Sequence, residues 1–117
     1  MLNVNRALRH FRREYANLRS QLRRAAESIP TNIVEGTARR SQKEFANFLQ
    51  ISFSSCSELE YHLRVAHDYG ILKKREWESL TRDTVEVRMM LAGLMKKVRA
   101  AHSSVPSSVA GKLKADG

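Results

Sequence analysis

Apolar residues recur every three or four positions through the first third of the chain, which is the spacing of one face of an α-helix. The stripe consists of Val4, Leu8, Phe11, Tyr15, Leu18, Leu22, Ala25, Ile29 and Ile33. Arg9, Arg13, Arg23 and Arg24 fall on the opposite side of the same helical wheel. The pattern predicts a long amphipathic helix over about residues 5–36, with a basic outer face.

A second helix is predicted over about residues 41–69. Ser41 with Glu44 three residues later is a capping-box signature for its start, and Gly70 marks its end. Its inward seam alternates spacings of four and three and contains Phe45, Leu49, Ser52, Cys56, Leu59, Leu63 and Ala66. The serine-rich middle of this seam would let a neighbouring helix approach closely.

The third predicted helix covers about residues 74–101. Its core stripe consists of Trp77, Leu80, Thr84, Val87, Leu91, Leu94 and Val98. Gly93 lies beside that stripe and is predicted to mark a close helix crossing, because an interior glycine lowers helix stability by up to about 1 kcal/mol. Residues 103–117 are rich in Ser, Gly, Ala and Lys, and are predicted to form a flexible basic tail. The expected organisation is one all-α antiparallel bundle domain, residues 1–102, followed by this tail.

Pro30 falls inside the first helical pattern, where it removes one backbone hydrogen bond and clashes with the carbonyl of Ala26. Because the apolar phase continues to Ile33, a kink or local break is predicted rather than a turn. The side chains of Ser28, Thr31 and Asn32 can bond the freed backbone groups. Gly36 is predicted to be the residue that ends the helix.

The composition is that of a single soluble domain with 117 residues, 42% of them hydrophobic and 28% charged. No stretch is long and apolar enough to span a bilayer, and the basic N-terminus lacks the apolar run of a secretory signal. A single cysteine, Cys56, cannot form an intrachain disulfide, so a cytoplasmic location is expected.

The formal net charge of +9 is unevenly distributed. Residues 1–43 hold nine Arg and one Lys against three Glu, a net +7, whereas residues 44–95 hold six basic and eight acidic residues, a net −2. A basic first third beside a nearly neutral remainder resembles an electrostatic footprint for a polyanion. The excess of positive charge could equally serve to keep the protein soluble.

Several motifs in the middle of the chain belong together. Gln-Leu-Arg-Arg-Ala-Ala at 21–26, Ser-Ile-Pro-x-Asn-Ile-x-Glu-Gly at 28–36 and Lys-Glu-Phe at 43–45 occur in that order. Ser-Glu-Leu-Glu at 57–60, Leu63 and the Tyr-Gly-Ile turn at 69–71 follow. This set, between about residues 18 and 94, resembles the small four helix bundle protein family, which includes proteins encoded in intervening sequences of bacterial 23S ribosomal RNA genes.

The resemblance implies a four-helix bundle and a ring-like homo-oligomer, with a pentamer as the expected form. It marks Pro30, Asn32, Glu35, Gly36, Ser41 and Glu44 as structural hallmark positions. The family has a separate N-terminal helix, but only 20 residues precede Gln21 here. That helix is therefore either missing, or reduced to a stub at Asn5–Arg13.

No residue pattern indicates catalysis or metal binding. His62 and His67 are five apart, about 140° around a helix, and no second cysteine completes a zinc set. Cys56 lies in an apolar seam, where a structural thiol is expected rather than a nucleophile. We therefore expect no enzymatic activity, no cofactor, no metal and no small-molecule substrate.

The arginines are the remaining candidates for a function. Those predicted to contact nucleic acid are Arg6, Arg9, Arg12, Arg13, Arg19, Arg23, Arg24, Arg39 and Arg40. Arg23 and Arg24 are expected to approach Arg39 and Arg40 at one end or one side of the bundle. They could equally be structural, by pairing with Glu27, Glu58 or Glu60. For Asn32 and Glu35, capping and hydrogen bonding near Pro30 are expected ahead of ligand binding.

The preferred hypothesis is a non-enzymatic, homo-oligomeric bundle that binds structured RNA, in preference to DNA, through its Arg-rich face. Aromatic residues are few, so contacts mainly to phosphates are expected, with weak sequence specificity. The alternative is a protein-interaction scaffold without a nucleic-acid role.

Overall fold

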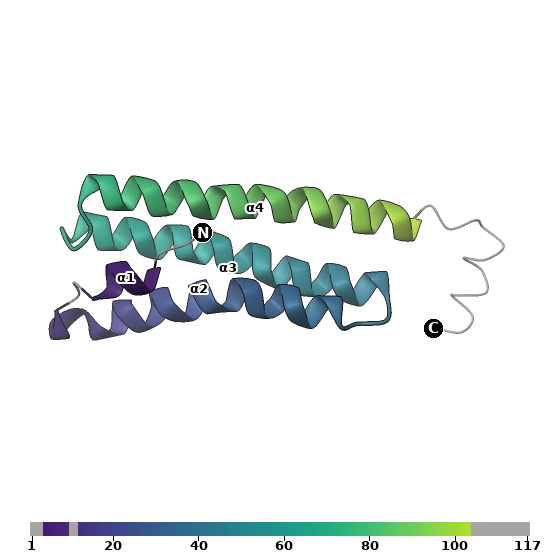
Figure 1. The fold of residues 1–117 in the computed structure, drawn as a ribbon, viewed down its shortest axis with the longest axis horizontal. Helices are drawn as coiled ribbons and strands as arrows, with labels where there is room; N and C mark the ends of the chain where they lie inside the picture. Colours follow the sequence, from purple (N-terminus) through teal and green to yellow (C-terminus); the bar gives the residue numbers. More distant parts are fainter. Residues whose placement is uncertain (1–3, 10–11, 104–117) are drawn as a thin grey trace.

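The computed structural model describes residues 4–9 and 12–103. Five helical elements follow one another in these residues, with no strand among them: α1 (Val4–Leu8), the short 3₁₀ helix η1 (Arg13–Tyr15), α2 (Ala16–Thr37), α3 (Gln42–Asp68) and α4 (Lys74–Ser103). The three long helices run side by side in a bundle of 59 × 21 × 19 Å (Figure 1). The predicted all-α bundle is therefore confirmed. Phe11 lies outside the described residues, as does the predicted tail beyond Ser103.

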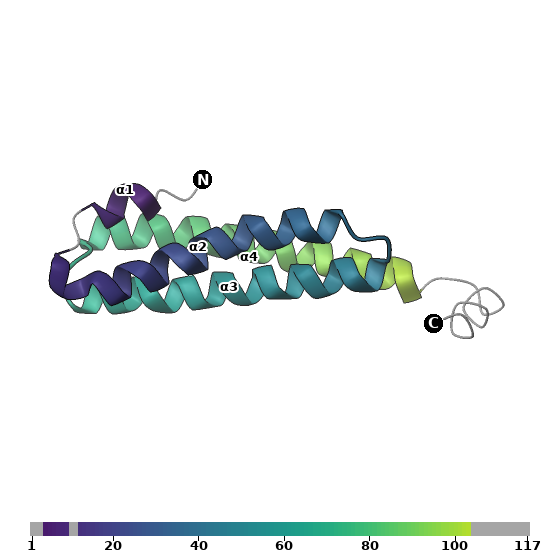
Figure 2. The ribbon, with the colours of Figure 1, turned by 90° about the horizontal axis from the view of Figure 1, so that it is seen from below.

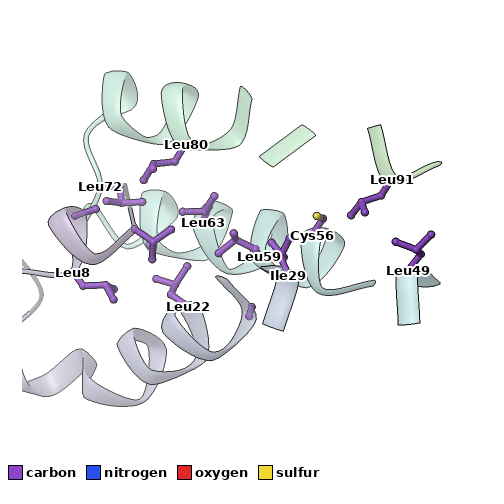
Figure 3. Packing of buried hydrophobic residues seen from close by; sticks show 14 of the residues in the cluster. Leu8, Leu22, Ile29, Leu49, Cys56, Leu59, Leu63, Leu72, Leu80 and Leu91 are labelled. Atoms are coloured by element: carbon purple, nitrogen blue, oxygen red, sulfur yellow. The ribbon is translucent and has the colours of Figure 1, made fainter. Parts of the chain in front are cut away.

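Helix α3 lies between α2 and α4 and supplies most of the contact between helices. Its buried residues include most of the predicted seam, with Leu49, Cys56 and Leu59 fully covered. Leucines from α2, from the α3–α4 turn and from α4 pack against this seam (Figure 3). Burying a leucine side chain contributes about 1.5–3 kcal/mol, so this seam is the main source of stability of the bundle.

The prediction of one continuous helix over residues 5–36 is wrong at its start. The chain reverses direction between α1 and α2, and α1 lies back against the bundle (Figures 1 and 2). Val4, Ala7 and Leu8 are buried there. A straight extension of α2 would leave them with nothing to pack on, because α3 ends and α4 begins at the same end of the molecule (Figure 1). Of the two alternatives for the first helix of the family, absent or reduced to a stub, the structure has the stub, with α1 at Val4–Leu8.

Helix α2 runs through Pro30 as one continuous helix, so the structure has no break there. Thr31 Oγ1 donates a hydrogen bond to the carbonyl of Glu27 at 2.8 Å, and Asn32 Nδ2 donates to the carbonyl of Ser28 at 2.8 Å. These bonds reach carbonyls four residues earlier, next to the proline, but neither goes to the Ala26 carbonyl that Pro30 leaves without a donor, so the predicted bonding of the freed group is not what the two side chains do.

Gly36 does not end α2, contrary to the prediction. The helix continues to Thr37, and Gly36 is buried inside its last turn. A Cβ added at Gly36 would lie 2.8 Å from Phe45 Cδ1 and 3.0 Å from Phe48 Cβ. The glycine is therefore required for the close approach of α2 to α3.

Helix α3 begins and ends where the sequence predicted. Ser41 Oγ accepts a hydrogen bond from the backbone N–H of Glu44 at 3.1 Å, which caps the first turn. Gly70 has φ +77°. Its N–H donates to the carbonyl of His67, and the Ile71 N–H donates to that of Ala66. This pair of bonds is the Schellman motif, which needs a left-handed residue that glycine adopts most easily.

The register of α4 is as predicted up to Leu91 and then changes. Met95 is buried with 5% exposure, whereas Leu94 is 37% exposed. The predicted stripe stepped by three from Leu91 to Leu94, and the structure steps by four. No atom lies within 4 Å of a Cβ built on Gly93, so the predicted crossing at Gly93 is wrong within the described chain.

Candidate nucleic-acid interface

All nine arginines of the predicted set are solvent-exposed. Six of them belong to α1 and the turn after it, η1 and the first two turns of α2, and they lie toward one end of the bundle. We call this group the N-terminal basic surface: Arg6, Arg9, Arg12, Arg13, Arg19 and Arg23. The reversal between α1 and α2 places α1 beside α2, so two short stretches of basic sequence lie next to one another (Figure 2).

Arg39 and Arg40 do not join this group. They follow the last turn of α2, about 20 Å along the helix axis from Arg24 at a rise of about 1.5 Å per residue. Of the two expected arrangements, one end or one side of the bundle, the two arginine pairs do not share one end. Arg39 Nη2 forms an ion pair with Glu35 Oε2 at 2.8 Å and lies over the ring of Phe48, so its guanidinium is held at the α2–α3 turn.

Arg24 is structural, as the ion-pair alternative predicted. Its Nη2 lies 3.1 Å from Glu58 Oε1 on α3, and His62 Nε2 lies 3.3 Å from the same carboxylate oxygen. The Arg24 side chain is 74% exposed, so the pair contributes little to stability.

Five guanidinium groups of the N-terminal basic surface have no carboxylate partner among residues 4–9 and 12–103: Arg6, Arg9, Arg13, Arg19 and Arg23. The sixth, Arg12, lies 3.9 Å from Glu14, and both side chains are mostly exposed. Arginine presents a planar fork of donors that matches phosphate oxygens, so uncompensated arginines are suited to a polyanion.

A groove of about 540 Å³ opens between α2 and α4, where the short α1 leaves the bundle uncovered. Its apolar floor comes from Val4, Ala26, Ile29, Pro30, Ile33, Val87 and Met90. Its rim carries both signs of charge, with Arg6, Arg23 and Glu27 on one side and Asp83 and Glu86 on α4. Met90 is 73% exposed, and the nearby Val34 is 66% exposed. This is the groove that a full-length fourth helix would fill.

Two aromatic contacts form at the end of the bundle that holds the α3–α4 turn. Tyr15 and Tyr69 stack with ring centroids 6.0 Å apart and planes 25° apart. His67 and Trp77 stack at 4.3 Å, with Arg64 over the Trp77 ring. No local pattern indicated the tyrosine pair, because its members lie 54 positions apart and meet only when η1 reaches the end of α3.

The sequence matches the family model described as 23S rRNA-intervening sequence protein over residues 1–93. The chain belongs to this family. The resemblance seen in the motifs is thereby confirmed, and the matched range includes the short α1.

A solved structure of a protein of unknown function from the S23 ribosomal protein family of Bacteroides thetaiotaomicron is similar to this chain. The two are 28% identical and superpose with a TM-score of 0.67, over 68% of this chain and 73% of that chain. No curated protein matches the sequence.

In this member of the intervening-sequence protein family, the hallmark residues hold the bundle together. Asn32 Nδ2 also donates to Ser28 Oγ at 2.9 Å, and Ser28 Oγ lies 2.7 Å from Ser55 Oγ of α3. Ser52 Oγ donates to the carbonyl of Ile29 at 2.8 Å. The serines predicted to allow close approach thus also bond α2 to α3. Asn32 thus makes the hydrogen bonds near Pro30 expected for it, whereas Glu35 pairs with Arg39 at the end of α2 instead.

A second ion pair between helices escaped prediction. Arg88 Nε lies 2.7 Å from Glu60 Oε2, and the two side chains are only 29% and 23% exposed. The Arg88 guanidinium also lies over the Phe53 ring. The helical spacing of Glu60 and Arg88 could have indicated that both border the core, but it could not pair them.

The titratable groups in the core do not form a catalytic set. Burial raises the pKa of the Cys56 thiol to about 11, with the nearby Glu60 carboxylate adding to the increase, so the thiol is protonated at neutral pH and is a poor nucleophile. Among the described residues, no group of three His, Cys, Asp or Glu side chains could hold a metal ion. In the same part of the chain, no helix is long and apolar enough to cross a membrane.

Proposed function

We propose that this chain is a non-enzymatic, homo-oligomeric protein of the bacterial cytoplasm that binds structured RNA through the N-terminal basic surface. The observation that carries the proposal is the group of five exposed guanidinium groups without carboxylate partners on α1, the turn after it, η1 and α2. Membership of a family named for an intervening sequence of 23S ribosomal RNA supports RNA as the polyanion.

The expected contacts are to phosphates. Guanidinium groups bind phosphate oxygens in pairs, and such contacts position a protein on a nucleic acid without reading its sequence. Within the N-terminal basic surface, α1 and η1 are too short to lie in a groove as recognition helices, because they have five and three residues, and the long α2 contributes only Arg19 and Arg23. The RNA is therefore recognised by its shape and charge, and duplex DNA binds more weakly.

The homo-oligomer forms through the groove between α2 and α4. The groove exposes an apolar floor, and Asp83 and Glu86 of α4 lie on its rim. A second copy of the chain would cover this floor, while Arg9, Arg12, Arg13 and Arg19, which do not line the groove, stay open to RNA. Filling the groove would bury Met90, which is the most exposed of the large hydrophobic residues in the described part of the chain.

The test is fluorescence anisotropy of nuclease-treated protein against three labelled ligands: a structured ribosomal RNA fragment, an unrelated RNA hairpin and a DNA duplex. An Arg9→Glu/Arg13→Glu variant is expected to bind RNA at least about 10-fold more weakly, since it removes two phosphate contacts and adds two repulsions. Lys96→Glu/Lys97→Glu is the matched control, because it makes the same charge change on two exposed residues near the far end of α4.

A smaller loss in the lysine variant would support the N-terminal basic surface as the binding site. Equal losses of RNA affinity in the two variants would show that only net charge matters, and would contradict the N-terminal basic surface as the binding site. Absence of RNA binding near physiological salt would overturn the proposal and favour the protein-interaction scaffold, for which the groove would be the docking site.

A further inference from the structure

The Tyr15–Tyr69 stack lies at the end of the bundle where η1 meets the turn between α3 and α4 (Figure 1). Tyr69 is the C-cap of α3, and the Schellman turn at Gly70 determines the backbone there. Although its ring stacks on Tyr15, Tyr69 remains 64% exposed. The residue is therefore largely open to solvent.

Basic residues lie close in sequence to both tyrosines. Arg12 and Arg13 precede Tyr15 by three and two positions. Lys73, just before α4, and Lys74 and Arg75, its first two residues, follow Tyr69 by four to six positions. All five are exposed. In the described residues Arg13, Lys73 and Arg75 make no ion pair, whereas Arg12 and Lys74 make long exposed ones with Glu14 and Glu78, at 3.9 and 3.8 Å.

Acidic residues at this end do not cancel the positive charge. They are Glu14, Asp68, Glu76 and Glu78, against the five basic residues above and Arg64. Asp68 is partnered by Arg64 at 3.5 Å, on the side of α3 that faces Trp77. Glu76 also makes no ion pair in the described residues. The six basic and four acidic residues give this end of the bundle a net charge of +2.

We propose that this end of the bundle binds an unpaired nucleotide of RNA, with its base stacked on Tyr69 and the adjoining phosphates contacted by Arg13 and by Lys73 or Arg75. An exposed aromatic ring between basic residues is the arrangement that proteins use for unpaired bases, because every base has a stacking face. The inference rests on the proposed function and adds the substrate class: RNA with an unpaired loop or bulge, in preference to a continuous duplex.

The structure supplies a matched control for the tyrosine. Tyr61 also belongs to α3 and is 66% exposed, but its ring makes an edge contact with His62 and stacks on no other tyrosine. It lies about 12 Å along the helix from Tyr69, at about 1.5 Å per residue. Replacing either tyrosine removes a similar exposed ring, so a difference between the two reports on position.

The experiment compares two fluorescein-labelled RNAs with the same stem, one closed by a six-nucleotide loop and one a blunt duplex. The wild-type protein is expected to prefer the looped RNA. Tyr69→Ala should weaken its binding by about 5- to 20-fold, at the lower end of the effect of losing one stacked base. Binding to the duplex should change less than 2-fold, and Tyr61→Ala should leave both affinities within about 2-fold of wild type.

Tyr69→Phe keeps the ring and should retain the preference for the loop. A loss of RNA affinity in Tyr69→Phe as large as in Tyr69→Ala would contradict stacking. So would a Tyr69→Ala variant that loses equal affinity for the two RNAs. Equal losses of affinity in Tyr61→Ala and Tyr69→Ala would also contradict it. If the wild-type protein binds both RNAs equally and depends on Arg9 and Arg13, this inference fails while the proposed function stands. If it binds neither RNA, both fail.

Discussion

At the scale of single residues, two glycines inside helices have opposite environments. Gly36 is buried where α2 meets the two phenylalanines of α3, and any side chain there would overlap Phe45. Gly93 is exposed in the middle of α4 with nothing within 4 Å of a built Cβ. Both residues lower helix propensity, but only the first is needed for packing within the chain.

Alanine substitutions at these two glycines should therefore change stability in opposite directions. Gly36→Ala is expected to lower the free energy of unfolding by about 1–3 kcal/mol, the typical effect of overpacking a core. Gly93→Ala should raise it by about 0.5–1 kcal/mol, because alanine is the better helix former. Urea denaturation followed by circular dichroism measures both. If Gly36→Ala raised the free energy of unfolding, α2 and α3 could move apart at this point without a loss of stability.

Local signals predicted the residues whose roles depend on their near neighbours. Ser41 and Gly70 cap α3 as expected, because each acts on backbone groups within four positions of itself. The role of Gly36 depends on Phe45 and Phe48 of another helix, so its sequence context indicated a helix end instead. The change of register from Leu94 to Met95 is of the same kind, since both residues lie next to Leu91 on the helical wheel.

At the scale of elements, α2 carries a proline that its hydrogen bonds support. The helix continues across Pro30, and Thr31 and Asn32 bond to carbonyls one turn back. A proline in a helix interior is about 3 kcal/mol less favourable than alanine. Pro30 is exposed and lines the groove, so its benefit to the monomer is small.

Pro30→Ala should therefore stabilise the isolated chain, raising the free energy of unfolding by about 1–3 kcal/mol through the restored bond to the Ala26 carbonyl. Asn32→Ala is the contrasting variant. It removes both hydrogen bonds to Ser28 and should destabilise by about 1 kcal/mol. Thermal denaturation of the two variants beside wild type tests this. A Pro30→Ala variant less stable than wild type would mean that the proline is required for the path of α2.

The start of the fold shows what periodicity cannot determine. The apolar stripe from Val4 to Ile33 has the same phase whether the chain runs straight or folds back, because both arrangements bury one face of each helix. The choice depends on where α3 and α4 end, which is a property of the assembled bundle. The sequence predicted the amphipathic segments correctly, but only the family resemblance suggested that the first segment is a separate helix from α2.

At the scale of the whole molecule, the bundle has three long helices and a groove in place of the fourth. Met89 and Met90 are adjacent on α4 and similarly exposed, at 63% and 73%, but only Met90 lines the groove. If a second copy covers the groove, a charge at Met90 must be buried against Glu86 and Glu27 of the same rim.

Met90→Glu is accordingly expected to weaken self-association at least about 10-fold, while Met89→Glu leaves it within about 2-fold of wild type. Sedimentation velocity over a range of protein concentrations measures both. An oligomer that survives Met90→Glu unchanged would place the interface elsewhere on the molecule. A monomeric wild-type protein at all concentrations would contradict the proposed homo-oligomer.

The candidate interface could be predicted from the sequence only in its composition. The excess of arginine in the first 43 residues identified the charged segment, but the division into paired and unpaired arginines depends on Glu58 and Glu35, which the fold brings to Arg24 and Arg39. The scarcity of aromatic residues in the sequence did not indicate the Tyr15–Tyr69 stack, because the two residues are separated in sequence by α2 and α3.

The most direct test of the account is the salt dependence of RNA affinity for the wild-type protein and for Arg9→Glu/Arg13→Glu. If about five phosphates are contacted by the N-terminal basic surface, log affinity should fall with log salt with a slope near −4 to −5, and the variant should have a slope smaller by about 2. A slope near zero, or one that is the same in both proteins, would contradict RNA binding through these arginines.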